Sequence, residues 1–131
     1  MIGLDTNVLA RYIVEDDEKQ ARIATRLIDN CPADDPAFVS HLVLVELTWV
    51  LSSCYDADKN AVVAVIEQLL QTKQLMVERG ETVWHALDDY KKSSADFSDC
   101  LLNRINQEAG CLTTVTFDKN AAKLAGMELC R

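Results

Sequence analysis

The sequence predicts an α/β protein, specifically a three-layer α/β/α sandwich around a central parallel sheet. Short apolar segments alternate with longer segments of helical period along the whole chain. The short segments lack polar alternation, which is typical of parallel strands covered on both faces. With 131 residues, 49% of them hydrophobic, and only four Gly and two Pro, the chain has the size and composition of one domain. We therefore expect a single domain over residues 1–131.

The first half of the chain is expected to open with a strand and then contain four helices. Each helix shows apolar residues three and four positions apart, or follows a side chain able to cap its first turn. In order, the expected elements are a short buried strand over residues 1–4, helices over 6–14 and from Asp16 or Asp17 to Asn30, a strand over 37–39, a helix over 41–54 capped by Ser40, and a helix from Asp58 to Thr72.

The second half repeats the alternation of strand and helix. Gly110 is expected to end the helix before it, because glycine readily adopts the left-handed conformation that follows many helices. In order, the expected elements are a strand over 75–77, a helix from a Thr82 cap to Lys92, a helix from Ser98 to Glu108, a strand over 112–115, a helix over 119–125 and an edge strand over 127–129.

Charge and cysteine usage narrow the class of protein. A net charge of −8 argues against a passive nucleic-acid-binding module, which is usually basic, but not against a nuclease whose carboxylates hold divalent cations. The five cysteines form no CxxC pair and the two histidines are isolated, so no zinc site is expected. Reduced thiols, the lack of a signal peptide and the lack of a long apolar run predict a cytoplasmic protein with no membrane segment.

Several carboxylates stand where a parallel sheet would form a ligand site. Asp5 and Asp118 follow predicted strands, and ligands bind at the carboxyl ends of such strands. Asp96 and Asp99 lie three residues apart at the start of a helix and so share a face. Glu46 interrupts a strongly apolar helix, where a buried carboxylate would need a cation or a cationic side chain to offset its desolvation.

These positions also have simpler interpretations. Asp5 and Asp118 could act only as helix caps, Asp96 and Asp99 could act only on a helix dipole, and Glu46 could pair with a lysine or arginine. If the carboxylates converge, a site without cysteine or paired histidine suits Mg²⁺ or Mn²⁺. Such ions serve phosphodiester hydrolysis by activating water and stabilising charge on the phosphate.

Four segments, in this order and spacing, resemble the PIN-domain family, and the overall form resembles the VapC-type toxins of toxin–antitoxin pairs. They are residues 4–9 (LDTNVL), Glu46, residues 95–102 (ADFSDCLL) and residues 112–118 (LTTVTFD). The similarity covers essentially the whole chain. It implies a Mg²⁺- or Mn²⁺-dependent ribonuclease acting on single-stranded RNA.

The resemblance also implies roles for individual residues and partners. Asp5, Glu46, Asp99 and Asp118 would form the catalytic, metal-binding set, Asp96 would be an additional carboxylate, and Thr116 would supply a supporting hydroxyl. Family members are commonly homodimers inhibited by a small antitoxin protein whose C-terminal segment lies over the active-site groove. One departure is residues 100–104 (CLLNR), which replace a small, Ala-rich helix. Asn103 and Arg104 could reach the groove, but we expect them, like the scattered lysines, to face solvent.

Three alternatives are kept beside this hypothesis. A phosphotransferase of the haloacid-dehalogenase type also begins with a strand and an aspartate, but it needs a second acid where Asn7 stands. A response-regulator receiver domain would need paired acids at the first strand and a lysine on a late strand, and neither is evident. A non-catalytic acidic binding module would share the composition without using the full set of acids.

Overall fold

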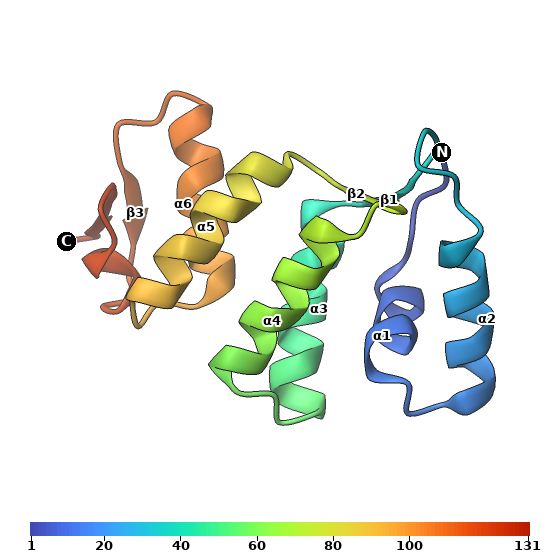
Figure 1. Ribbon diagram of the computed structural model, residues 1–131. Helices are drawn as coiled ribbons and strands as arrows, with labels where there is room; N and C mark the ends of the chain where they lie inside the picture. The colour runs from blue at the N-terminus through green and yellow to red at the C-terminus, as the bar shows by residue number, and fades with distance from the viewer. The chain divides into compact units, whose positions relative to one another are not determined.

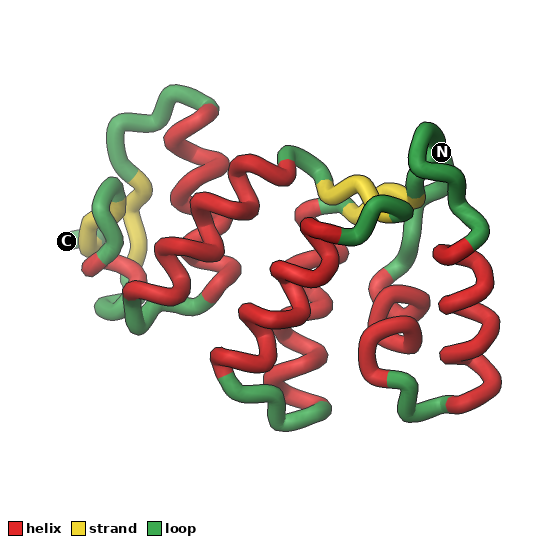
Figure 2. Tube along the Cα trace, in the orientation of Figure 1, coloured by secondary structure: helices red, strands yellow, loops and turns green.

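The computed structural model describes all residues, 1–131, and forms two compact units, Met1–Glu78 and Arg79–Arg131. Each unit is described by itself. Both contain helices and a pair of parallel strands, which confirms the α/β class (Figure 1). The strands are short beside the helices, as Figure 2 shows by colour.

The sheet of the first unit pairs β1 (Ala37–Val39) with β2 (Leu75–Val77) in parallel, as the sequence predicts. The predicted strand over residues 1–4 is reduced to a single bridge between Gly3 and Phe38. Two backbone hydrogen bonds hold it, from Leu4 N–H to Phe38 O and from Phe38 N–H to Ile2 O, at 3.0 and 2.7 Å. The expectation of a buried strand is wrong, because this segment contacts only one strand and leaves Ile2 45% exposed.

Four helices complete the first unit: α1 (Thr6–Val14), α2 (Glu18–Asp29), α3 (His41–Cys54) and α4 (Lys59–Gln71). Their beginnings agree with the predicted caps. The side chains of Asp17, Ser40 and Asp58 accept backbone N–H groups of α2, α3 and α4 at 3.0, 3.2 and 2.8 Å. Helix α1 packs against α2 and α3, and α3 against α4, around a core of Leu9, Ile28, Leu44, Leu47, Ile66 and Leu69.

The second unit consists of α5 (Gly80–Lys92), α6 (Phe97–Glu108), β3 (Thr114–Thr116), the 3-10 turn η1 (Ala121–Lys123) and β4 (Met127–Leu129). Strands β3 and β4 pair in parallel. Helices α5 and α6 pack on each other through Val83, Leu87 and Leu101, which are almost fully buried. Gly110 has φ 98° just after α6, so it ends the helix as predicted.

Four elements of the second unit differ from the prediction. The strand expected over residues 112–115 forms over Thr114–Thr116, and Leu112 is fully exposed. Helix α5 begins at Gly80, after Arg79 turns the chain with φ 44°, and Thr82 lies inside it with its hydroxyl donating to the Glu108 carboxylate. Helix α6 begins at Phe97, one residue before Ser98. The predicted last helix over 119–125 is wrong, because only the short η1 turn forms before Gly126.

Two further expectations concern the chain as a whole. All five cysteines are free thiols, and only Cys100 is buried. No helix of the structure combines the length and the apolar character needed to cross a lipid bilayer.

Candidate active site

The predicted carboxylates fall into two groups, one in each unit. The first unit contains Asp5 and Glu46, and the second contains Asp96, Asp99 and Asp118. Each group is built by the local structure around it. The geometry of each therefore follows from its own helix ends and turns.

Asp5 stands at the N-terminus of α1 and acts as its cap. Its Oδ1 accepts the Thr6 N–H at 2.7 Å. The interpretation of Asp5 as a helix cap is therefore correct, but capping uses only one of its two carboxylate oxygens. Oδ2 makes no hydrogen bond, and the exposed side chain leaves this oxygen open to a ligand.

Glu46 is fixed to the same helix terminus by a side-chain contact. The Thr6 hydroxyl donates to Glu46 Oε2 at 2.9 Å, and Thr6 itself is only 7% exposed. A buried hydroxyl therefore holds the carboxylate of α3 beside the first turn of α1. Sequence reasoning missed Thr6, although its place directly after Asp5, in the first turn of the helix, was a usable signal.

The expectation that Glu46 is buried in an apolar helix is wrong, because its side chain is exposed. Leu42, Glu46 and Trp49 are spaced four and three residues apart and so share one side of α3. Leu42 and Trp49 are 69% and 65% exposed, which shows that this side is uncovered in spite of its apolar residues. The hydroxyl of Thr6, not a burial requirement, defines the position of Glu46.

In the second unit, Asp99 lies in the first turn of α6, two residues after helix-opening Phe97. Its side chain is half-buried, and burial raises the pKa of Asp99 above its usual value; the negative charges of Asp96 and Asp118 raise it further. A cation beside Asp99 would relieve the repulsion from those charges.

Asp118 is held by the turn that follows β3. The Thr116 hydroxyl oxygen accepts the Asp118 N–H at 3.0 Å, and Asp118 Oδ1 accepts the N–H groups of Asn120 and Ala121 at 2.8 and 3.0 Å. As with Asp5, one oxygen is used on the backbone and Oδ2 makes no hydrogen bond. The Ser94 hydroxyl donates to Asn120 Oδ1 at 3.4 Å, which ties this turn to the loop before Asp96.

These donor atoms fit a hard divalent cation. They are carboxylate oxygens with no sulfur or imidazole among them, and Asp5 and Asp118 each offer an oxygen free of hydrogen bonds. The structure contains no group of three or more His, Cys, Asp or Glu side chains already arranged to hold a metal ion. The type of donor atom therefore fits Mg²⁺ or Mn²⁺, although the donors do not form a complete coordination shell.

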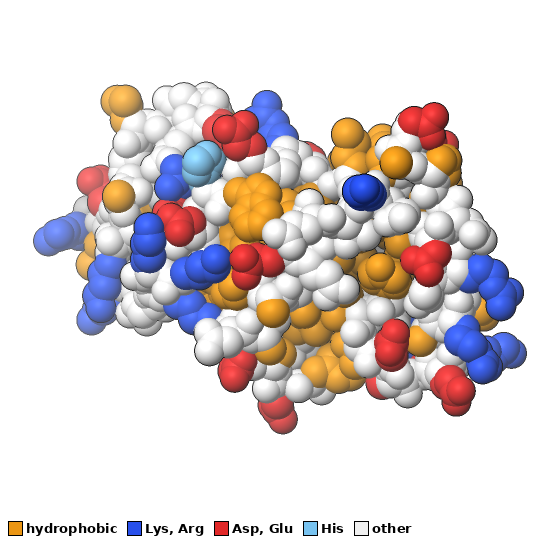
Figure 3. Space-filling model, viewed as in Figure 1, with side chains coloured by type: hydrophobic (Ala, Val, Ile, Leu, Met, Phe, Trp, Pro, Cys, Tyr) orange, Lys and Arg blue, Asp and Glu red, His pale blue; other side chains and the backbone are white.

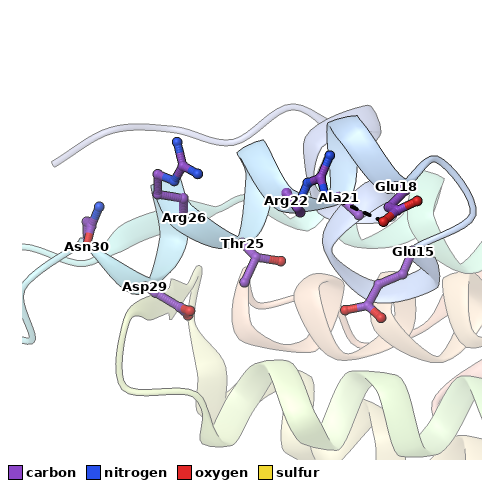
Figure 4. Close-up of a pocket in the computed structure, with 8 residues that line it drawn as sticks. All are labelled: Glu15, Glu18, Ala21, Arg22, Thr25, Arg26, Asp29 and Asn30. Carbon is purple, nitrogen blue, oxygen red and sulfur yellow. Dashed lines mark ion pairs between the residues drawn. The ribbon is translucent and has the colours of Figure 1, made fainter.

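A separate surface depression lies along α2 and contains none of these carboxylates. Figure 4 shows its side chains spread along the helix without converging on a point, with Arg22 paired to Glu18 at 3.5 Å. Alternating charges of this kind are typical of a solvated helix face. We assign no chemistry to this depression.

Comparisons with known proteins agree with the predicted resemblance. The PIN domain family model matches residues 2–127. The VapC ribonuclease of Aquifex aeolicus (strain VF5) is 26% identical over 121 residues, which is 92% of this chain and 90% of that protein. The family match spans Asp5, Glu46, Asp99 and Asp118, so both carboxylate groups lie within it.

Proposed function

The chain belongs to the PIN-domain family, and we propose that it is a divalent-metal-dependent endoribonuclease that cleaves single-stranded or structured RNA. The observation that carries the proposal is the group around Asp99. Asp99 is a half-buried carboxylate whose pKa is raised by burial and, beyond that, by the charges of Asp96 and Asp118. A half-buried carboxylate beside like charges is favoured by a bound cation, and divalent cations serve phosphodiester hydrolysis.

In this proposal Asp5, Glu46, Asp99 and Asp118 are the carboxylates that bind Mg²⁺ or Mn²⁺, and the chain acts as a single nuclease domain. The backbone caps orient Asp5 and Asp118, and the Thr6 and Thr116 hydroxyls support Glu46 and Asp118. When bound, the ion promotes ionisation of the attacking water and stabilises charge on the phosphate. Asp96, which is exposed and makes no cap hydrogen bond, is assigned as the carboxylate that accepts the proton of that water.

The proposal is tested by RNA cleavage with metal removed and restored. EDTA should abolish cleavage of a single-stranded RNA, and excess Mn²⁺ should restore it. Asp118→Asn should lower the rate by about 100-fold or more, because a ligand of the reacting centre is lost. Glu128→Gln is the matched control, since Glu128 is an exposed acid on β4 with no hydrogen bond or ion pair. Equal cleavage by Asp118→Asn and Glu128→Gln would reject the assignment.

Two outcomes would favour the alternatives instead. A phospho-aspartyl intermediate trapped on Asp5 would indicate a phosphotransferase. A calorimetric titration that detects no Mn²⁺ binding at millimolar metal would indicate a non-catalytic binding module. Either result is distinguishable from slow but metal-dependent RNA cleavage.

We also propose that a small antitoxin protein inhibits this nuclease, as in toxin–antitoxin pairs. Support comes from an open groove between α1 and α2 in the first unit, next to the turn that carries Asp5. Ile23 and Leu27 of α2 line the groove and are 57% and 43% exposed, so an apolar segment of a partner would cover them.

The antitoxin proposal is tested by coexpression with any small open reading frame found immediately upstream of the gene. The two proteins should copurify, and the pair should cleave RNA more slowly than the nuclease alone. Ile23→Glu with Leu27→Glu should abolish copurification, whereas Arg22→Glu, on the depression along α2, should not. Copurification that survives the double substitution would place the antitoxin elsewhere.

A further inference from the structure

A second polar depression lies entirely within the second unit and is lined by residues of α5, α6 and the turn at η1. Basic side chains dominate its charged residues, and Asp89 is the one acid that lines it. The lining residues that matter here are Asp89, Lys92, Asn103, Arg104 and Lys123. The sequence did not indicate this cluster, because its cations come from α5, α6 and η1 and are as many as 31 positions apart.

Arg104 is the fixed centre of the depression. Its Nε and Nη2 donate to the two oxygens of Asp89 at 2.6 and 2.9 Å, a bidentate pair that holds the guanidinium in one orientation. An arginine side chain has five N–H donors, and this pair uses two of them. The remaining donors form a planar group suited to phosphate oxygens.

Two lysines add mobile positive charge around that centre. Lys92 pairs with Asp88 at 2.9 Å but its side chain is still 74% exposed. Lys123 is exposed and has no ion-pair partner. The second unit has seven Lys and Arg and eight Asp and Glu; two of these acids, Asp99 and Asp118, are the carboxylates proposed to bind metal. Figure 3 shows Lys and Arg side chains over the part of the view that α5, α6 and the C-terminal segment occupy in Figure 1.

The depression and Asp99 are both built on α6. Asn103, which lines it, lies four residues after Asp99 and therefore on the same face of the helix. Arg104 follows, about 7.5 Å beyond Asp99 along the helix axis at 1.5 Å per residue. That separation is on the order of one to two nucleotides, because a strand rises about 3.4 Å per nucleotide when stacked and extends further when single-stranded.

We infer that this depression binds a backbone phosphate of the RNA substrate, one or two nucleotides from the phosphate that is cleaved. The inference rests on the proposed function, because it assigns part of the same substrate. Arg104 binds the phosphate in a fixed orientation, and Lys92 and Lys123 contribute charge. Such a contact positions the strand without reading its sequence.

The test is RNA binding by fluorescence anisotropy over a range of salt concentrations, with a short labelled single-stranded oligoribonucleotide. All variants carry Asp99→Asn to prevent cleavage. Lys92→Gln with Lys123→Gln should weaken binding by about 10-fold and reduce the salt slope by about 0.7, the value for one phosphate contact on a single strand. Lys73→Gln, an exposed lysine of the first unit, is the matched control and should change neither quantity.

An unchanged affinity and salt slope in the double variant would overturn the inference, and exposed lysines leave little risk that the variant misfolds. If the double variant lost antitoxin binding but bound RNA as well as its parent, the inference would also be overturned. The depression would then bind an acidic protein instead of RNA. If wild-type protein binds RNA with the predicted salt dependence but cleaves none, the proposed function fails while this inference stands. If the Asp99→Asn parent binds no RNA at all, both fail.

Discussion

Asp99 is an acidic side chain in a position that disfavours its charged form. It is half-buried, and the negative charges of Asp96 and Asp118 act on it. Its raised pKa means that the native state holds a proton more tightly than the unfolded chain, whose aspartates titrate near 3.8. In metal-free protein, ionised Asp99 therefore costs stability as pH rises above 3.8, and the full cost is present above the raised native pKa. Functional sites often retain such a cost because the bound ligand removes it.

Asp99→Asn should therefore separate stability from activity. In EDTA at neutral pH we expect the variant to melt a few degrees above the wild type, whereas near pH 3.5 the two should melt together. RNA cleavage by the same variant should fall by about 100-fold or more, because a metal ligand is lost. Thermal melts across pH and a cleavage assay measure the two effects, and a variant less stable than wild type at neutral pH would contradict the assignment of repulsion at Asp99.

Thr6 is expected to act through Glu46 and is a positioning residue. Replacing its hydroxyl in Thr6→Val keeps the shape of the buried side chain but removes the 2.9 Å hydrogen bond to Glu46. Losses of about 10- to 100-fold in metal affinity or activity are usual for residues that orient a ligand. Thr6→Ser should restore most of the activity and of the Mn²⁺ affinity measured by calorimetry. Full activity in Thr6→Val would show that Glu46 needs no such support.

At the scale of elements, the sequence predicted the helices best where a capping side chain precedes an amphipathic segment. Asp17, Ser40 and Asp58 each mark the start of a helix to within one residue. The prediction failed at α5, where the start depends on a left-handed Arg79 and not on a side-chain cap. A positive φ at a non-glycine residue has no local sequence signature, so Thr82 was the nearest plausible cap and was wrong.

The candidate site was predictable as a set of acids but not as a geometry. Strand ends indicated Asp5 and Asp118, and the structure adds that each uses only one oxygen on the backbone. The apolar sequence around Glu46 suggested burial, but which side of an apolar helix is covered depends on tertiary packing. The sequence also could not show the Thr6 contact with Glu46, because the two residues are 40 positions apart.

The exposed part of α3 around Trp49, about one turn beyond the proposed metal ligand Glu46, is the surface that we propose for the expected homodimer. Leu42 and Trp49 are both large and mostly exposed, which is unfavourable for an isolated monomer. Trp49→Asp should shift the protein to monomers in sedimentation velocity, because a charge would be buried in an apolar interface. Arg131→Asp, at the exposed C-terminal residue, is the control. A wild-type protein that is monomeric at all accessible concentrations would exclude this interface.

For the whole molecule, the distribution of charge differs between the two units. The first unit has 13 Asp and Glu against six Lys and Arg, while the second is nearly balanced. An acidic chain is therefore compatible with RNA binding, since the excess of acidic residues lies mostly in the first unit and the unit that carries Asp99 is nearly balanced. Net charge alone would have hidden this asymmetry.

The expectation of a single domain predicts one cooperative unfolding transition. The first unit contains Trp49 and the second contains Trp84, so each tryptophan reports on one unit. Trp84→Phe and Trp49→Phe variants should show fluorescence transitions in urea with the same midpoint, after correction for the stability change of each substitution measured by circular dichroism. Two separated transitions would show that the units fold independently.

The central claim is the proposed metal-dependent cleavage of RNA, with Asp5 and Asp99 among the residues proposed to serve it. The most direct measurement is the Mn²⁺-dependent rate of RNA cleavage by Asp5→Asn, Asp99→Asn and the double variant. Each single variant should lose about 100-fold or more, and the double variant should lose little beyond either one, because residues that act as a unit are not additive. Cleavage at the wild-type rate in either single variant, or losses that multiply in the double variant, would contradict the account.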